Sequence, residues 1–150
     1  SIMFNALKIP QISKLVQVGI RDYCEAENEI IEQSNGRIAT YFDRDLKAAR
    51  FNGKTWKEQC AEIVAQLPEK VYLSFDIDGL DPKLCPNTGT PVAGGFEVEE
   101  VLFLLETVVK SGKKIIGLDL NEVAPGEDEW DANVGARMLY KLCNIMAVVS

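Results

Sequence analysis

Two aspartates one residue apart, Asp76 and Asp78, are the residues whose type and spacing most directly suggest chemistry. They follow the run VYLSF at 71–75, which is typical of a β-strand. A strand places every second side chain on one face, so both carboxylates would point the same way, roughly 7 Å apart. Two like charges at that separation repel each other unless a cation or a proton lies between them. Because carboxylate oxygens are hard ligands, the pair is a candidate site for Mg²⁺ or Mn²⁺.

The same residues allow two other interpretations. Acidic residues after a strand can simply cap the next turn, and Asp81-Pro82 is a common turn-forming pair. A strand that ends in DxDG also resembles the nucleophile strand of the haloacid dehalogenase phosphatases. That family normally has Thr or Val after the second aspartate, whereas Gly79-Leu80 follows here, which disfavours this interpretation.

The elements that would position these aspartates are a series of alternating strands and helices. Thr55 and Glu58 have the spacing of a helix-capping box, and Pro68 would end that helix. The predicted strands are Lys14–Ile20, Arg37–Phe42, Lys70–Ile77 and Lys114–Leu120, and the predicted helices are Glu25–Gln33, 56–67, a segment from Val98 to Ser111, and a well-buried Ala132–Val149.

This alternation predicts an α/β domain with a mainly parallel sheet, in which Lys70–Ile77 is a central strand covered on both faces. Sites in such sheets lie beyond the carboxyl ends of the strands. Three strands end in polar residues, namely Arg21-Asp22, the Asp76/Asp78 pair, and Asp119 with the nearby Glu122. We therefore expect these groups to meet at one edge.

Composition limits the classes of partner. The chain has 150 residues, a net charge of −7 and no histidine. An acidic chain without a basic cluster is unlikely to bind nucleic acid or an anionic membrane, while a small cationic substrate would suit its charge. Its four scattered cysteines and the lack of a long apolar run predict free thiols in a cytoplasmic protein. Any chemistry that needs histidine must take that residue from elsewhere.

Three segments, in the right order, carry a resemblance to a known family. The segment SFDIDGLDPKLCPNTGTPVAGG at 74–95 resembles a signature of the arginase/agmatinase (ureohydrolase) family. GLDLNEVAP at 117–125 resembles that family's D-x-x-E-V-x-P motif, and QVGIRD at 17–22 resembles a mid-chain strand.

The resemblance implies a fold, a cofactor and a set of site residues. It implies a three-layer α/β/α fold and two Mn²⁺ ions held by six ligands, two of which are Asp76 and Asp78. A hydroxide shared by the ions would attack the guanidinium carbon of the substrate, and urea would leave. Glu122 corresponds to the glutamate that binds the guanidinium, and Thr90 to a threonine near the reacting centre. Asp81 would brace the loop.

The chain also departs from the family pattern. The upstream GGDH-type and DAHxD-type segments, which carry the other four ligands, are missing, so residues 1–150 correspond to the C-terminal part of a single ureohydrolase-like domain. Asn87 stands where the family often has Gly or Ala, and we expect it to tolerate a left-handed turn. Family resemblance further implies a homo-oligomer, a trimer or a hexamer.

The substrate follows from the residues around the expected amine-binding position. Cys24 stands where arginases place an aspartate, so an agmatine-like compound is favoured over arginine, and Glu25 is a candidate substrate-binding residue. In the competing interpretation, Glu25 or Glu27 replaces that aspartate and the arginine-specific contact is kept. Asn5 lies in a segment that resembles the substrate-binding region. Formiminoglutamate as substrate, and a non-catalytic remnant or partner-dependent half-domain, are the alternatives.

Overall fold

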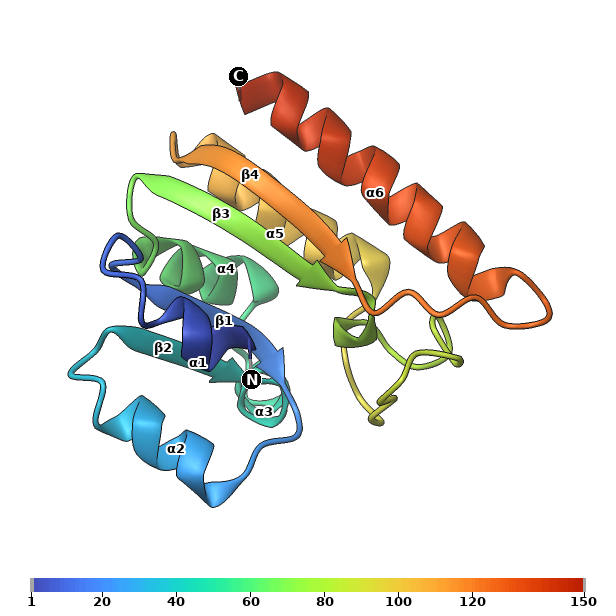
Figure 1. Ribbon diagram of the computed structural model, residues 1–150. Coiled ribbons are helices and arrows are strands. Elements are labelled where there is room, and N and C mark those ends of the chain that lie inside the picture. Colours follow the sequence, from blue (N-terminus) through green and yellow to red (C-terminus); the bar gives the residue numbers. More distant parts are fainter. Residues whose placement is uncertain (1, 150) are drawn as a thin grey trace.

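Strands and helices alternate along the chain in the computed structural model, which describes residues 2–149 (Figure 1). The strands are β1 (Leu15–Ile20), β2 (Ile38–Phe42), β3 (Lys70–Asp76) and β4 (Lys114–Asn121). The helices are α1 (Ile2–Ala6), α2 (Glu25–Glu32), α3 (Asp43–Phe51), α4 (Trp56–Ala65), α5 (Val98–Lys110) and α6 (Trp130–Val149), and a 3-10 turn, η1 (Ile77–Gly79), follows β3.

All the strand pairs in the described residues are parallel, which confirms the predicted α/β class. The strands form two separate ladders, β1 with β2 and β3 with β4, rather than the single sheet that the sequence predicted. Within residues 2–149 each strand thus hydrogen-bonds to one neighbour only, and the edges of β1 and β3 that face away from their partners stay unpaired.

Helices cover one face of the β3–β4 ladder. Leu73, Phe75, Leu118 and Leu120 on that face pack into a core with residues of α4, α5 and α6. On the opposite face Tyr72, Ser74 and Asp76 are exposed, Tyr72 by 58%. The expectation that this strand is covered on both faces is therefore wrong for the chain in hand. The alternation of exposed and half-buried residues along β3 is that of a strand with a single packed face.

Local sequence explains where α4 begins. Thr55 accepts a hydrogen bond from the Glu58 backbone N–H at 3.2 Å, and Glu58 accepts one from the Thr55 N–H at 2.7 Å, which confirms the capping box of α4. Helix α6 buries only one side, through Val134, Met138 and Leu142. It is therefore less buried than its apolar composition suggested.

Two further observations bear on the composition-based expectations. Cys24, Cys60, Cys85 and Cys143 are all free thiols, as predicted. Among residues 2–149, no helix combines the length and apolarity needed to cross a membrane.

Candidate functional site

The two aspartates lie where β3 gives way to a tight turn. The strand ends at Asp76, not at Ile77, and Asp78 is in the 3-10 turn that follows. The side chain of Ile77 is completely buried and anchors this turn in the core. Asp76 is exposed and Asp78 is partly exposed, on either side of the buried Ile77, although the strand does not extend to Asp78.

Asp76 belongs to a polar network on the uncovered face of the β3–β4 ladder. The Asn121 amide donates to Asp76 Oδ1 at 3.2 Å and to Asp119 Oδ1 at 2.6 Å, and Ser74 Oγ donates to Asp119 Oδ1 at 2.8 Å. Desolvation raises the pKa of Asp76, and the charges of Asp78 and Asp119 raise it further, against the lowering effect of Asn121. The aspartates thus repel each other here, and a cation would relieve that repulsion.

The segment at 78–95 forms a closed loop beyond the end of β3 (Figure 1). A bridge between Leu80 and Phe96 joins its two ends, with the Asp81 N–H donating to the Phe96 carbonyl at 2.9 Å. Gly95 permits this closure, since its φ is +91° and a Cβ there would lie 2.5 Å from the Leu80 carbonyl oxygen. Asp81 Oδ1 accepts the Lys83 N–H at 3.0 Å, as expected of a brace.

The same loop contacts both Asp78 and Glu122. Thr90 Oγ1 donates to Asp78 Oδ2 at 3.3 Å. Thr88 Oγ1 donates to the Glu122 backbone carbonyl at 2.9 Å, and a Cβ on Gly89 would lie 3.8 Å from Glu122 Oε2. The loop therefore places Thr90 against Asp78, and the two residues that precede Thr90 against Glu122.

Sequence reasoning missed an anchor of the loop. Asp131, at the start of α6 and 0% exposed, accepts the Asn87 backbone N–H at 3.0 Å and the Asn87 side-chain amide at 2.9 Å. Asn87 is not among the residues with positive φ, so it does not adopt the left-handed turn that we expected. Its amide side chain serves the contact with Asp131 instead. A buried-carboxylate contact across 44 residues leaves no local signal in the sequence.

The two predicted substrate-binding residues lie apart from this cluster. Asn5 is in α1 and accepts a hydrogen bond from Lys8 at 3.0 Å, and Glu25 is the exposed first residue of α2. Among residues 2–149, no hydrogen bond joins either one to Asp76, Asp78 or Glu122, so both assignments stay predictions. Glu27 accepts the Cys24 N–H at 3.0 Å, which leaves Glu25 as the free carboxylate of the two alternatives.

The donor set fits part of a manganese site. Within residues 2–149, no group of three or more His, Cys, Asp or Glu residues could hold a metal ion. The oxygen donors of Asp76 and Asp78 suit Mn²⁺, and their mutual repulsion is the electrostatic situation that a cation would stabilise. They could supply two ligands, and the remaining ligands would have to come from outside these residues.

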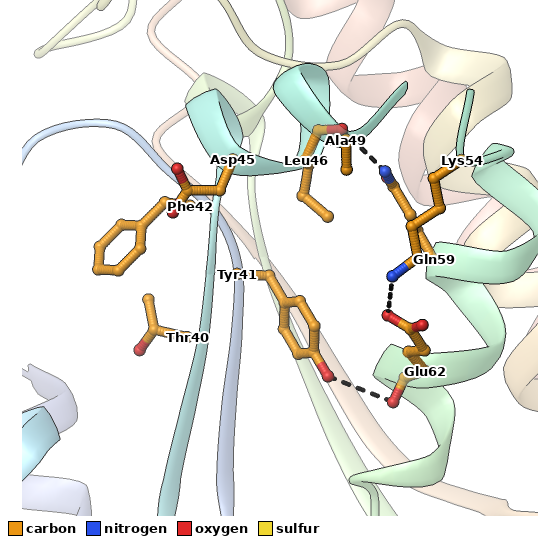
Figure 2. A pocket seen from close by; sticks show the side chains of 9 residues that line it. All are labelled: Thr40, Tyr41, Phe42, Asp45, Leu46, Ala49, Lys54, Gln59 and Glu62. Atoms are coloured by element: carbon orange, nitrogen blue, oxygen red, sulfur yellow. Dashed lines mark hydrogen bonds and ion pairs between the residues drawn. The ribbon is translucent and has the colours of Figure 1, made fainter. Parts of the chain in front are cut away.

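A hollow of about 170 Å³ lies elsewhere, between β2, α3 and α4 (Figure 2). The Tyr41 hydroxyl donates to the Glu62 backbone carbonyl at 3.2 Å, and Lys54 and Glu62 form an ion pair of 2.6 Å. Gln59 donates to the Leu46 carbonyl at 2.8 Å. These contacts join α4 to β2, to α3 and to the segment before α4, so we assign the hollow to packing.

The fold and the site together define a parallel α/β protein with an oxygen-donor site at the carboxyl end of a strand. The model of the Arginase family matches residues 1–144. The chain is 34% identical over 111 residues to arginase-1 from Oryctolagus cuniculus, covering 74% of this chain and 33% of that protein. It is 40% identical over 117 residues to an agmatinase from Cronobacter sakazakii, covering 69% of this chain and 37% of that protein.

The comparison with solved structures agrees. A structure described as a hypothetical agmatinase from Burkholderia thailandensis superposes with a TM-score of 0.70 and 30% identity, over 95% of this chain and 42% of that one. The chain belongs to the arginase family. It spans about a third of the length of the curated relatives it matches, which confirms that it corresponds to the C-terminal portion.

Proposed function

We propose that this chain is the C-terminal part of a manganese-dependent hydrolase that cleaves a guanidino compound to urea and an amine. The observation that carries the proposal is that one loop, where β3 and β4 end, contacts Asp78 through Thr90 and Glu122 through Thr88 and Gly89. Relatives named arginase and agmatinase support the reaction class.

In this proposal Asp76 and Asp78 hold the metal. Bound Mn²⁺ supplies a Lewis acid that makes water nucleophilic at neutral pH. The protein need not then contribute a strong base, which is consistent with a chain that has no histidine. Thr90 donates its hydroxyl hydrogen to Asp78 and so fixes one orientation of that carboxylate.

Glu122 orients the substrate. Its carboxylate lies beside Gly89 of the loop, and Gly89 directly precedes Thr90 in the sequence. A guanidinium can donate two parallel N–H bonds to one carboxylate, a charge-assisted contact that sets both its position and its plane. In this proposal Glu122 favours a cationic guanidinium over a neutral amide.

Agmatine is the favoured substrate, before arginine and formiminoglutamate. The position where arginases place an aspartate for the substrate's α-amino group is Cys24, which offers a thiol in place of a carboxylate. Agmatine lacks the α-carboxylate of arginine, so it needs fewer contacts there. Glu25 remains available for its terminal ammonium group, as does Asn5 for a hydrogen bond.

The two ligands in this chain do not complete a dinuclear site, so catalysis requires residues beyond 2–149. Intact mass of the natural protein, compared with 16.6 kDa for these 150 residues, shows whether a longer chain supplies them. We expect the longer protein to release urea from agmatine faster than from arginine when Mn²⁺ is present. An absence of Mn²⁺-dependent urea release from any guanidino compound would favour the alternative of a non-catalytic remnant.

Asp78→Asn tests the metal assignment in that protein, because it keeps the size of the side chain and removes its charge. We expect at least a hundredfold loss of urea release together with weaker Mn²⁺ binding. Asp45→Asn is the matched control, since Asp45 is an exposed aspartate of α3 and lines the packing hollow. Retained activity in Asp78→Asn would refute the assignment.

A further inference from the structure

Arg21 is the most heavily engaged side chain near the site, and neither the metal nor the substrate assignment uses it. It lies directly after β1 and is half-buried. Its guanidinium donates to the backbone carbonyls of Gly79 and Gly19, both at 3.3 Å, and to that of Asp78. It also donates to the Val92 carbonyl at 3.2 Å.

These bonds connect the two ends of the 78–95 loop. Asp78 and Gly79 begin the loop, and Val92 lies 14 positions after Asp78, close to its end. Loops this long without regular structure sample many conformations unless other contacts restrain them. A guanidinium has five N–H donors in a rigid plane, and one such group can restrain both ends at once.

A second attachment secures the far end of the loop. Lys47 Nζ donates to the Gly95 carbonyl at 3.1 Å and pairs with Asp43 Oδ2 at 2.9 Å. Gly94 lies against the same groups, since a Cβ there would be 2.8 Å from Asp43 Oδ2 and 3.1 Å from Arg21 Cδ. The loop end is thus packed directly on the Arg21 stem.

We propose that Arg21 is a positioning residue, which ties the start of the 78–95 loop to its end and so holds Asp78 opposite Thr90 for metal binding. Arg21 fixes the backbone at Asp78 and at Val92, two residues after Thr90, so both partners of the 3.3 Å Thr90–Asp78 bond depend on it. The part that concerns metal rests on the proposed function, whereas the restraint of the loop does not.

Arg21→Met and Arg21→Lys test the inference in the natural full-length protein. Methionine keeps an apolar stem and removes every donor, whereas lysine keeps the charge but cannot reach both loop ends with a planar fork. Arg37→Met is the matched control. Arg37 is also half-buried and donates to backbone carbonyls, at 2.7 Å to Ile12 and 3.3 Å to Ile9, but in a different segment.

The first measurement is amide hydrogen exchange of the metal-free protein. We expect both Arg21 variants to speed exchange of the 79–95 amides at least tenfold, while the β3–β4 amides keep their protection and show that the fold is intact. Arg37→Met should leave the 79–95 amides unchanged. If the 79–95 amides of the Arg21 variants exchanged at the same rates as in the wild type, the proposal would be overturned.

The second measurement is the affinity for Mn²⁺ alone, obtained by isothermal titration calorimetry. Loss of groups that orient metal ligands typically weakens metal binding 10- to 100-fold, and we expect a loss of that order in both Arg21 variants but not in Arg37→Met. A mobile loop with unchanged Mn²⁺ affinity would overturn the positioning role. If the wild-type protein binds no Mn²⁺, the proposed function fails, and hydrogen exchange still decides whether Arg21 restrains the loop.

Discussion

Glu122 has a backbone conformation that is unusual for its residue type. Its φ is +63°, in the left-handed region where a side chain with a Cβ is strained. Its carbonyl accepts the Thr88 hydroxyl at 2.9 Å, which places the residue against the loop in this conformation. Strain that the surrounding structure maintains is often found at functional sites, because it directs a side chain where the chemistry requires it.

Replacing Glu122 by glycine should therefore separate stability from activity. Glycine removes the strain of a left-handed residue but loses more entropy on folding, so we expect a net gain of about 1 kcal/mol in the free energy of unfolding. Urea release by the full-length protein should fall at least a hundredfold, because the guanidinium loses its carboxylate partner. Denaturant unfolding and a urea assay measure the two effects.

Glu129→Gly provides the control, since Glu129 also has a left-handed backbone, with φ of +59°, and lies outside the cluster at the loop. We expect a similar gain in stability with unchanged activity. Full activity in Glu122→Gly would show that Glu122 does not bind the substrate.

At the scale of the elements, the capping box of α4 makes a pH-dependent contribution to stability. Hydrogen bonds from the Thr55 side chain and then its backbone lower the pKa of Glu58 from its ordinary value of 4.5. A carboxyl group whose pKa is lowered in the folded state stabilises the fold above its unfolded-state pKa. That contribution is lost as the pH falls through its folded-state pKa.

Thr55→Ala removes both the cap and the main cause of the lowered pKa. We expect it to cost about 1 kcal/mol at pH 7. The difference from the wild type should narrow as the pH falls through the lowered folded-state pKa of Glu58, because only below that pKa is Glu58 protonated in both folded proteins. Thr107→Ala is the control, as its hydroxyl donates to a carbonyl, that of Phe103, and so has no pH-dependent partner. A gap for Thr55→Ala that is constant with pH would contradict this account.

The elements also show what sequence alone could and could not predict. Long periodic segments such as α5, and the capped helix α4, were placed nearly to the residue because their signals are local. Helix α3 was missed, since Leu46 is its one buried apolar residue and gives no periodic pattern. The end of β3 was misplaced because Ile77, an apolar residue that reads as strand, is buried in a turn.

The site divides along the same line. Its aspartates, Thr90 and Glu122 could be chosen from motifs, because those residues cluster in two short segments. The contacts of Arg21 with the loop, and that of Asp131 with Asn87, join residues 44 to 71 positions apart. Such contacts depend on how the elements pack, so no spacing in the sequence could reveal them.

At the scale of the whole molecule, the open face of β3–β4 determines how the 150-residue chain behaves alone. Tyr72 is 58% exposed there, and Ile116 is 60% exposed at the irregularity where the β3–β4 register shifts. Within the described residues, β1 and β3 each have one edge whose backbone groups are not paired with another strand. Exposed apolar side chains beside free strand edges favour association, so we expect this chain to be poorly soluble when produced alone.

Ile116→Lys tests this cause directly. A charge on the open face should disfavour association, so the soluble monomeric fraction of the 150-residue chain should rise several-fold in size-exclusion chromatography. Phe51→Lys is the matched control, because Phe51 is 87% exposed at the end of α3, away from the β3–β4 ladder, and we expect it to change solubility little. In a full-length protein that covers this face, Ile116→Lys should instead lower the free energy of unfolding, because the lysine would then be buried without a partner. A wild-type chain that elutes as a monodisperse 16.6 kDa monomer would show that the open face does not drive association.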